Sequence, residues 1–153
     1  MEFKESLQEG KITENYVLNS IKKKYPKAYI VDGYCKEHDI VIPELDQTIE
    51  VKQDQKSNYT GNYVVEVFMF GKPSGLLTST ANYWVFSDGE KLTWTTREII
   101  KDKILLENYK LITFTGKGDT EPKKAYLVPK EDIENTALRV IKLDDKISRS
   151  TTE

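Results

Sequence analysis

The chain around residue 50 alternates apolar and charged residues. Ile49 and Val51 fall on one face of a predicted strand, and Glu50 and Lys52 fall on the other. Asp39 stands near the start of the preceding predicted strand, so it can lie beside Glu50. Two carboxylates and a lysine can form a small Mg²⁺ site, in which the acids bind the metal and the lysine orients a water molecule or stabilises developing negative charge. An ordinary edge strand with solvated Glu and Lys is the alternative that spacing alone leaves open.

Two further carboxylates fall on faces that the pattern makes apolar. Glu14 shares the predicted inward face of the leading helix with Val17, and Glu66 shares strand parity with Val64 and Phe68. Buried carboxylates are costly unless they are paired or bind a metal. The pattern therefore predicts one polar cluster of acids inside an apolar domain. A helix cap or a salt bridge is the alternative for each of the two.

The elements that must position these residues follow from periodicity and turn residues. A helix is predicted over 4–25, with its firm part at 12–25, and Pro26 stops it. Thr95 and Glu98 predict a capping box that opens a helix to about Leu106. Two more short helices are predicted over 74–81, capped by Ser74, and over 131–137. The predicted strands are 28–32, 39–42, 48–52, 62–70, 83–87, 91–94, 109–115, 125–128 and 138–143. This order predicts a mixed α/β domain built on one sheet, with residues 1–147 as a single domain and 148–153 as a frayed tail.

Composition excludes several classes of protein. The chain has 153 residues, which favours one domain, and its 38% hydrophobic content is typical of a globular protein. One cysteine, Cys35, and one histidine, His38, cannot build a disulfide framework or a zinc site, so a metal must be held by carboxylates. The net charge of −2 gives no strongly basic coat. No apolar run approaches the length of a membrane span and the N-terminus is too polar for a signal peptide, so a cytoplasmic protein is expected.

Glu14 on the leading helix, then Asp39, then Glu50-Val51-Lys52, in a helix–strand–strand–strand order, resembles the PD-(D/E)XK nuclease superfamily. The resemblance covers roughly residues 10–87 and departs from the pattern at His38, which stands where many members have proline. It implies a restriction-endonuclease-like core, with a mixed central sheet flanked by helices. It also implies Mg²⁺-dependent hydrolysis of DNA phosphodiester bonds, in which Mn²⁺ can substitute.

The resemblance also implies a role for each matching residue. Asp39 matches the metal-binding aspartate, Glu50 the second metal-binding acid, Lys52 the catalytic lysine, and Glu14 the helix glutamate, a further metal ligand. Residues 60–75 resemble phage-type members, in which the position of Glu66 is an accessory acid beside the site. Gln53, next to Lys52, is a candidate for holding a water molecule beyond the metal's own ligands.

These assignments predict a metal-dependent endonuclease acting on double-stranded DNA, of the homing or restriction type. A Holliday-junction resolvase or a repair and processing nuclease satisfies the same residues. A non-catalytic DNA-binding protein on the same fold is the alternative from another class. One active site per small domain favours a homodimer or higher homo-oligomer, because both DNA strands must be cut.

The predicted positions of the lysines and aromatic residues separate surface contacts from packing. Four lysines in predicted loops are the candidates for contacting the DNA backbone: Lys72, Lys117, Lys123 and Lys124. Four aromatic residues are expected to pack in the core or against a sheet and not to stack on bases: Tyr59, Tyr63, Trp84 and Trp94.

Overall fold

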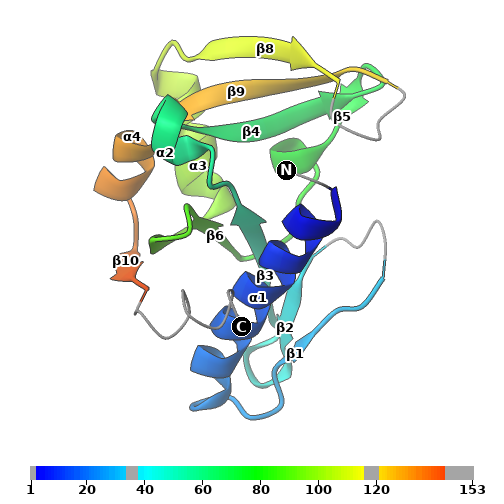
Figure 1. The fold of residues 1–153 in the computed structure, drawn as a ribbon, viewed down its shortest axis with the longest axis vertical. Coiled ribbons are helices and arrows are strands. Elements are labelled where there is room, and N and C mark those ends of the chain that lie inside the picture. Colours follow the sequence, from blue (N-terminus) through cyan, green and yellow to red (C-terminus); the bar gives the residue numbers. More distant parts are fainter. Residues whose placement is uncertain (1–2, 34–37, 116–120, 144–153) are drawn as a thin grey trace.

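The computed structural model describes residues 3–33, 38–115 and 121–143, with side chains from residue 10 onward. Within these residues the chain forms two β-sheets, one of six strands and one of four. Figure 1 shows the smaller sheet at one end of the molecule and a long helix lying across the larger sheet. The predicted mixed α/β class is confirmed, and the prediction of a single sheet is wrong.

The long helix α1 (Phe3–Lys22) opens the fold. Val17 and Leu18 are buried on its inner face, as the helical spacing predicts. The helix ends three residues before the predicted limit at residue 25, since the amide groups of Lys24 and Tyr25 both donate to the carbonyl of Ile21 in a closing turn. The following proline disfavours helical geometry at the residue before it, which is why the turn does not continue.

The larger sheet, sheet A, is mixed. Its strands are β1 (Tyr29–Ile30), β2 (Ile40–Ile42), β3 (Gln47–Gln53), β6 (Tyr83–Ser87), β7 (Lys91–Thr95) and β10 (Arg139–Lys142), in the spatial order β1-β2-β3-β6-β7-β10. β1, β2 and β3 form an antiparallel meander, and β6 then pairs with β3 in parallel. A parallel neighbour needs a long crossover, and the crossover between β3 and β6 carries two strands of the other sheet.

The smaller sheet, sheet B, collects the remaining strands. These are β4 (Asn62–Met69), β5 (Lys72–Pro73), β8 (Lys110–Phe114) and β9 (Lys123–Pro129), in the order β5-β4-β9-β8. β4 pairs with β9 over most of its length, although the two strands lie far apart in the sequence. The strand ranges read from alternation are therefore close to the observed ones. Which strand pairs with which cannot be read from the local sequence. This is why one sheet is predicted and two are observed.

Short helices connect the strands: α2 (Ser57–Thr60), α3 (Arg97–Leu106) and α4 (Lys130–Asn135), with 3-10 turns η1 (Pro43–Leu45) and η2 (Gly75–Leu77). The predicted capping box is wrong by one residue, because Thr95 still belongs to β7 and Thr96 caps α3 by accepting from the amide of Ile99. The helix predicted over 74–81 is only the single turn η2. Ser74 precedes this turn without capping it, because its hydroxyl donates instead to Glu66.

Two hydrophobic cores lie on the two faces of sheet A. Val17, Ile49 and Val85 belong to the core beneath α1. Tyr63 and Trp84 belong to the other core, which also includes residues of sheet B and α3. The predicted packing role is confirmed for Tyr63 and Trp84, which are buried, and for Trp94, which packs partly buried against the first core. It is wrong for Tyr59, which is almost fully exposed on α2.

Among the described helices, none is long and apolar enough to cross a membrane. The predicted tail at 148–153, Cys35 and Lys117 lie outside the described residues.

Candidate active site

Asp39 lies just before β2 and contacts β3 at two points. The paired residues of the β2–β3 ladder end at Ile40 and Ile49, and the Asp39 amide donates to the carbonyl of Ile49 at 2.9 Å. Asp39 is buried, and its Oδ2 accepts a hydrogen bond of 2.7 Å from the amide of Val51. The Asp39 carboxylate is therefore held against the β3 backbone between Glu50 and Lys52.

Glu50 and Lys52 lie together on the same face of β3. Lys52 Nζ is 3.2 Å from Glu50 Oε1, and the side chains are 44% and 16% exposed respectively. Lys52 Nζ also lies 5.6 Å from the centre of the Trp84 ring, on the adjacent strand β6. An ammonium over an aromatic face is held by the ring's electrostatics. Lys52 is thus positioned by two neighbours but remains accessible to a ligand.

The predicted division of β3 into two faces is confirmed. Ile49 and Val51 pack in the core beneath α1, whereas Glu50 and Lys52 share the opposite face with Trp84. The carboxylate and the ammonium group therefore stand at the border of a buried aromatic core. In such a position charges are screened less than in open water.

Gln53 lies on the face that carries α1 and not on the face of Glu50. The Thr13 hydroxyl of α1 donates to Gln53 Oε1 at 2.5 Å. This contact ties the first helix to the end of β3. Gln53 therefore supports the strand from the α1 side, and its role of holding a water molecule stays a prediction.

Glu14 follows Thr13 on α1 and is half-buried. Its helix covers the Val51 face of sheet A, the reverse of the face that carries Glu50. Within the described part of the chain, no group of three or more His, Cys, Asp or Glu side chains is arranged to hold a metal ion. The prediction of one cluster joining Glu14, Asp39, Glu50 and Glu66 is therefore wrong, and of these residues Asp39 is the one whose carboxylate is bonded to β3 next to Glu50, at the Val51 amide.

Glu66 lies in sheet B, on the less buried face of β4. The buried face is formed by Tyr63, Val65 and Val67, whereas Val64 is exposed, so the inward parity predicted for Glu66 is wrong. The β4–β9 register shifts between Glu66 and Phe68, which marks a bulge. The bulge is not the reason for the error, because Tyr63, Val65 and Val67 stay on one buried face up to it. Glu66 shares parity with Val64 as predicted, but the core covers the other face of the strand.

The carboxylate of Glu66 has two partners on neighbouring elements. Ser74 Oγ donates to Glu66 Oε2 at 2.8 Å, and Lys123 Nζ is 3.3 Å from Glu66 Oε1. Gly75 permits the close approach, because a Cβ at this position would lie 2.3 Å from the backbone oxygen of Glu66. Its positive φ of 51° also favours glycine.

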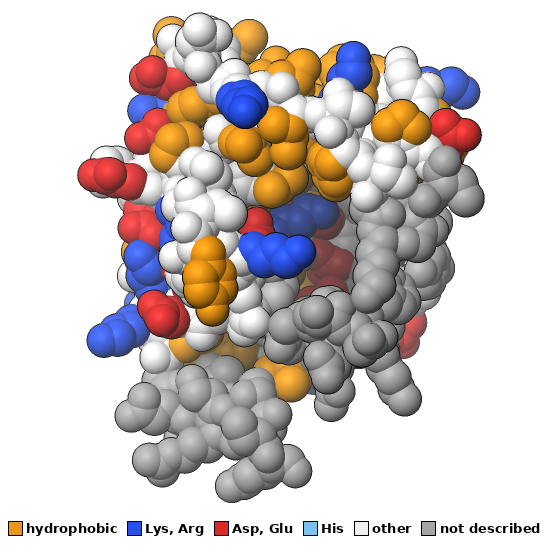
Figure 2. All heavy atoms as spheres, turned by 45° about the horizontal axis from the view of Figure 1, so that its top comes forward, with side chains coloured by type: hydrophobic (Ala, Val, Ile, Leu, Met, Phe, Trp, Pro, Cys, Tyr) orange, Lys and Arg blue, Asp and Glu red, His pale blue; other side chains and the backbone are white. Residues whose placement is uncertain are grey.

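The three candidate DNA-contacting lysines that the structure describes lie on sheet B and not in loops. Lys72 is on β5, and Lys123 and Lys124 begin β9. Lys124 and Lys72 are exposed, while Lys123 is half-buried by its ion pair with Glu66. Figure 2 shows a hollow on the face turned to the viewer, in which basic and acidic side chains lie next to one another.

Two carboxylates are a sufficient donor set for Mg²⁺. This ion keeps several of its waters and is commonly bound through one or two carboxylates together with phosphate oxygens of the substrate. Asp39 and Glu50 supply such a pair, and Lys52 adds a positive charge beside Glu50. The residues present therefore fit a magnesium ion that completes its coordination with water and substrate.

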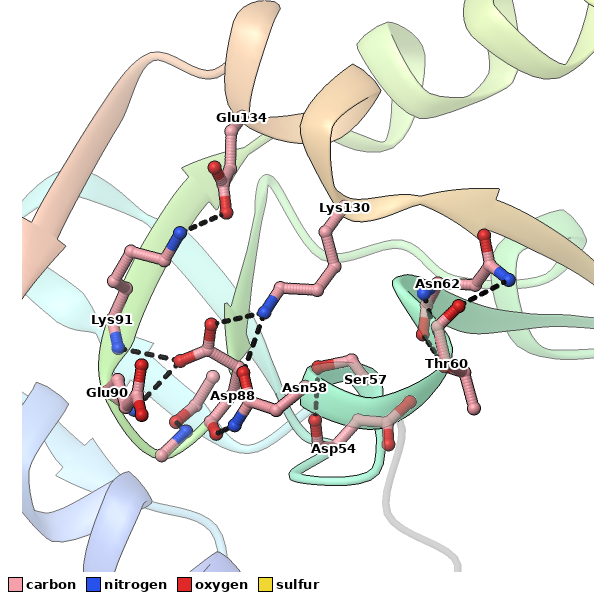
Figure 3. A network of polar contacts seen from close by, with 12 residues as sticks. Asp54, Ser57, Asn58, Thr60, Asn62, Asp88, Glu90, Lys91, Lys130 and Glu134 are labelled. Atoms are coloured by element: carbon pink, nitrogen blue, oxygen red, sulfur yellow. Dashed lines mark hydrogen bonds and ion pairs between the residues drawn. The ribbon is translucent and has the colours of Figure 1, made fainter.

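A second polar network, which the sequence did not reveal, lies where β3 and β6 end (Figure 3). The Asp88 side chain is fully buried and its Oδ2 accepts from Lys130 Nζ at 2.6 Å. Asp88 Oδ1 accepts from the amides of Glu90 and Lys91. Burial alone would raise the pKa of the Asp88 carboxyl, but these hydrogen bonds outweigh it and hold the pKa below its usual value.

The network joins α4 to the β6–β7 turn. Besides the Lys130–Asp88 pair, Lys91 Nζ is 2.6 Å from Glu134 Oε1, and this hydrogen bond raises the pKa of Lys91. Lys130 also donates to Asn58 on α2. These residues are tens of positions apart in the chain, so no local spacing could have identified them.

Asp54, directly after β3, is half-buried at the edge of this network. Burial raises the pKa of its carboxyl, against the opposing effect of the backbone amides of Val64, Ser57 and Lys56. A titratable group with a raised pKa two residues from Lys52 is a further candidate for the site. The sequence did not point to Asp54, because this residue lies outside the predicted strand 48–52 and belongs to no motif.

Replacing Lys130 with methionine is expected to lower the free energy of unfolding by about 3 kcal/mol, because it leaves the buried Asp88 carboxylate without its countercharge. Urea unfolding followed by circular dichroism measures the loss. The double variant Asp88→Asn/Lys130→Met is expected to be more stable than Lys130→Met, since the asparagine carbonyl can still accept from the amides of Glu90 and Lys91. Equal stability of the two variants would show that the buried charge is not the cause.

The sequence matches no family model, and comparison with curated proteins and with solved structures finds no similar protein.

Proposed function

We propose that this protein is a Mg²⁺-dependent DNA endonuclease with a restriction-endonuclease-like core. The observation that carries the proposal is the hydrogen bond that holds the Asp39 carboxylate against β3 at Val51, between Glu50 and Lys52, which form an ion pair. The order of elements supports it as well: a leading helix, an antiparallel three-stranded meander, and then a strand parallel to the third. These residues and this order are the ones on which the resemblance to the PD-(D/E)XK superfamily rests.

The proposed site assigns a task to each residue. Asp39 and Glu50 would hold the metal, and the bond from the Val51 amide would keep the Asp39 carboxylate fixed as the ion binds. When bound, Mg²⁺ polarises the scissile phosphate and activates water. Lys52 would approach the attacking water or a phosphoryl oxygen and stabilise the negative charge that develops there.

Glu66 has a subordinate place in this proposal, in which it orients Lys123 through their ion pair on sheet B. Glu14 is left out of the proposed metal site, because its helix covers the reverse face of sheet A. Lys72, Lys123 and Lys124 would contact phosphates of double-stranded DNA, and these contacts would make binding weaken with salt.

Metal dependence tests the proposed activity directly. We expect Mg²⁺ or Mn²⁺ to support cleavage of duplex DNA, and Ca²⁺ to support binding with little turnover, because its looser coordination positions water poorly. Cleavage of a plain duplex, a four-way junction and a random-sequence library, each measured with Mg²⁺ and with EDTA, also separates a site-specific enzyme from a junction resolvase or a repair nuclease. Activity that EDTA leaves unchanged would exclude the metal mechanism. DNA binding without any cleavage would identify a non-catalytic binding protein.

A further inference from the structure

Strand β8 forms an open edge of sheet B. It pairs with β9 on one side, and no described strand pairs with its other side. Figure 1 shows β8 as the outermost strand at that end of the molecule. The backbone amides and carbonyls on such an edge are a template for pairing with another strand.

The other edge strands of the two sheets carry features that discourage pairing. β1 and β5 have two residues each, and β5 contains Pro73. β10 has a charged residue at both ends, Arg139 and Lys142. β8 has five residues, and only Lys110 at its start is charged. Proteins protect sheet edges by short strand length, proline and charge. Of the four edge strands, β8 is the longest and the least protected in these ways.

Three exposed leucines lie around this edge. Leu105 and Leu106 end α3 and are 79% and 82% exposed, and Leu111 on β8 is 45% exposed. Leu111 lies opposite Tyr126 in the β8–β9 ladder, and Tyr126 lines an apolar groove of about 220 Å³ together with Leu105. Leu105 and Leu111 are therefore joined through Tyr126, and Leu106 is the next residue of α3, four positions before β8 begins. Leucines exposed to this degree and gathered in one place indicate a surface that is covered by a partner.

We propose that the β8 edge and the leucines at positions 105, 106 and 111 form a two-fold interface with a second copy of this chain. Antiparallel pairing of β8 with itself satisfies both edges at once, because each strand supplies the donors and acceptors that the other lacks. In this arrangement Leu111 faces its counterpart near the two-fold axis, and the α3 leucines flank it.

The charges around the surface fit self-association. Most of the lysines near this edge have acidic neighbours: Lys103 Nζ is 3.9 Å from Glu107 Oε1, and Lys123, opposite Phe114 of β8, is ion-paired with Glu66. Lys101, Lys110 and Lys124 add positive charge and Asp102 negative charge, so the surface is mildly basic and carries both signs. To bind a strongly basic or strongly acidic partner, this surface would instead need an excess of the opposite charge. The inference does not depend on the proposed nuclease activity, although a dimer would supply the second active site needed to cut both DNA strands.

Analytical ultracentrifugation of the full chain over a range of concentrations tests the interface. We expect a concentration-dependent dimer, and we expect Leu105→Lys/Leu106→Lys to weaken it by at least about tenfold, since the charges must be desolvated on association. The matched control is Leu138→Lys, which changes a leucine that is 57% exposed beside sheet A. A wild-type chain that stays monomeric at every concentration overturns the proposal, as does a dimer that the double variant leaves intact.

Cross-linking tests the strand pairing within that interface. Leu111→Cys in a Cys35→Ser background is expected to form a disulfide-linked dimer under mild oxidation, because opposite residues of paired strands lie within the reach of a disulfide. Leu138→Cys in the same background controls for random collision. Absence of the Leu111→Cys cross-link, or equal cross-linking of the control, would rule out β8 pairing. Circular dichroism verifies that each variant is folded.

Discussion

The Asp39→Asn variant is expected to lose cleavage activity and to remain folded. Asparagine keeps the shape of the side chain, and its carbonyl oxygen can still accept the hydrogen bond from the Val51 amide. The variant loses the negative charge that, with Glu50, would hold the metal. Removing one of two neighbouring carboxylates also relieves their mutual repulsion when no metal is bound, so the melting temperature is expected to stay equal or to rise. Single-turnover cleavage, a Mg²⁺ titration and thermal unfolding measure the three effects.

The control for this experiment is Asp46→Asn. Asp46 is exposed in the turn between β2 and β3 and has a positive φ of 51°, a conformation that asparagine tolerates. It carries the same chemical change on the same hairpin without touching the proposed site. An Asp39→Asn protein as active as the Asp46→Asn control would contradict the metal-binding role of Asp39. An Asp39→Asn protein that is unfolded would show instead that the charge serves the structure.

Lys52→Ala is expected to lower the single-turnover cleavage rate by on the order of 10²–10³, the loss typical of removing one electrostatic stabiliser of a transition state. DNA affinity, measured in Ca²⁺, should fall far less, because one phosphate contact contributes a small share of the total. Lys52→Arg should not restore the rate. A planar guanidinium does not reproduce the compact ammonium that lies between Glu50 and the Trp84 ring.

Lys56→Ala is the matched control for Lys52→Ala. Lys56 is exposed four residues later, just before α2, and its side chain caps nothing. If Lys52 were only a solvated strand residue, both variants would cleave at nearly the wild-type rate. A large loss of binding with an unchanged single-turnover rate would move Lys52 from catalysis to DNA contact and would weaken the nuclease proposal as a whole.

The sequence by itself determined the local structure around the proposed site. Alternation in β3 separates Ile49 and Val51 from Glu50 and Lys52, and the structure has the same two faces. Helical spacing likewise identified the inner face of α1, where Val17 is buried. These properties are local, because side-chain direction follows from the period of the backbone alone.

Predictions failed where a residue's surroundings come from distant parts of the chain. The inward face assigned to Glu66 was wrong because the core packs against the opposite face of β4, which carries Tyr63, Val65 and Val67. Glu14 was expected beside Asp39 and Glu50, but its helix covers the reverse face of sheet A. A helical pattern shows which side of a helix is apolar and does not show which face of a sheet it will cover.

Only the tertiary structure decided how the strands divide between two sheets and how buried charges are matched. The pairing of β4 with β9 and the contact of Lys130 with Asp88 join residues that are far apart in sequence. Such contacts depend on the closure of long loops and on the burial of whole surfaces. A local sequence pattern does not indicate either of these. The contact of Asp39 with β3 next to Glu50 was predictable because a short antiparallel connection leaves few ways to pair two adjacent strands.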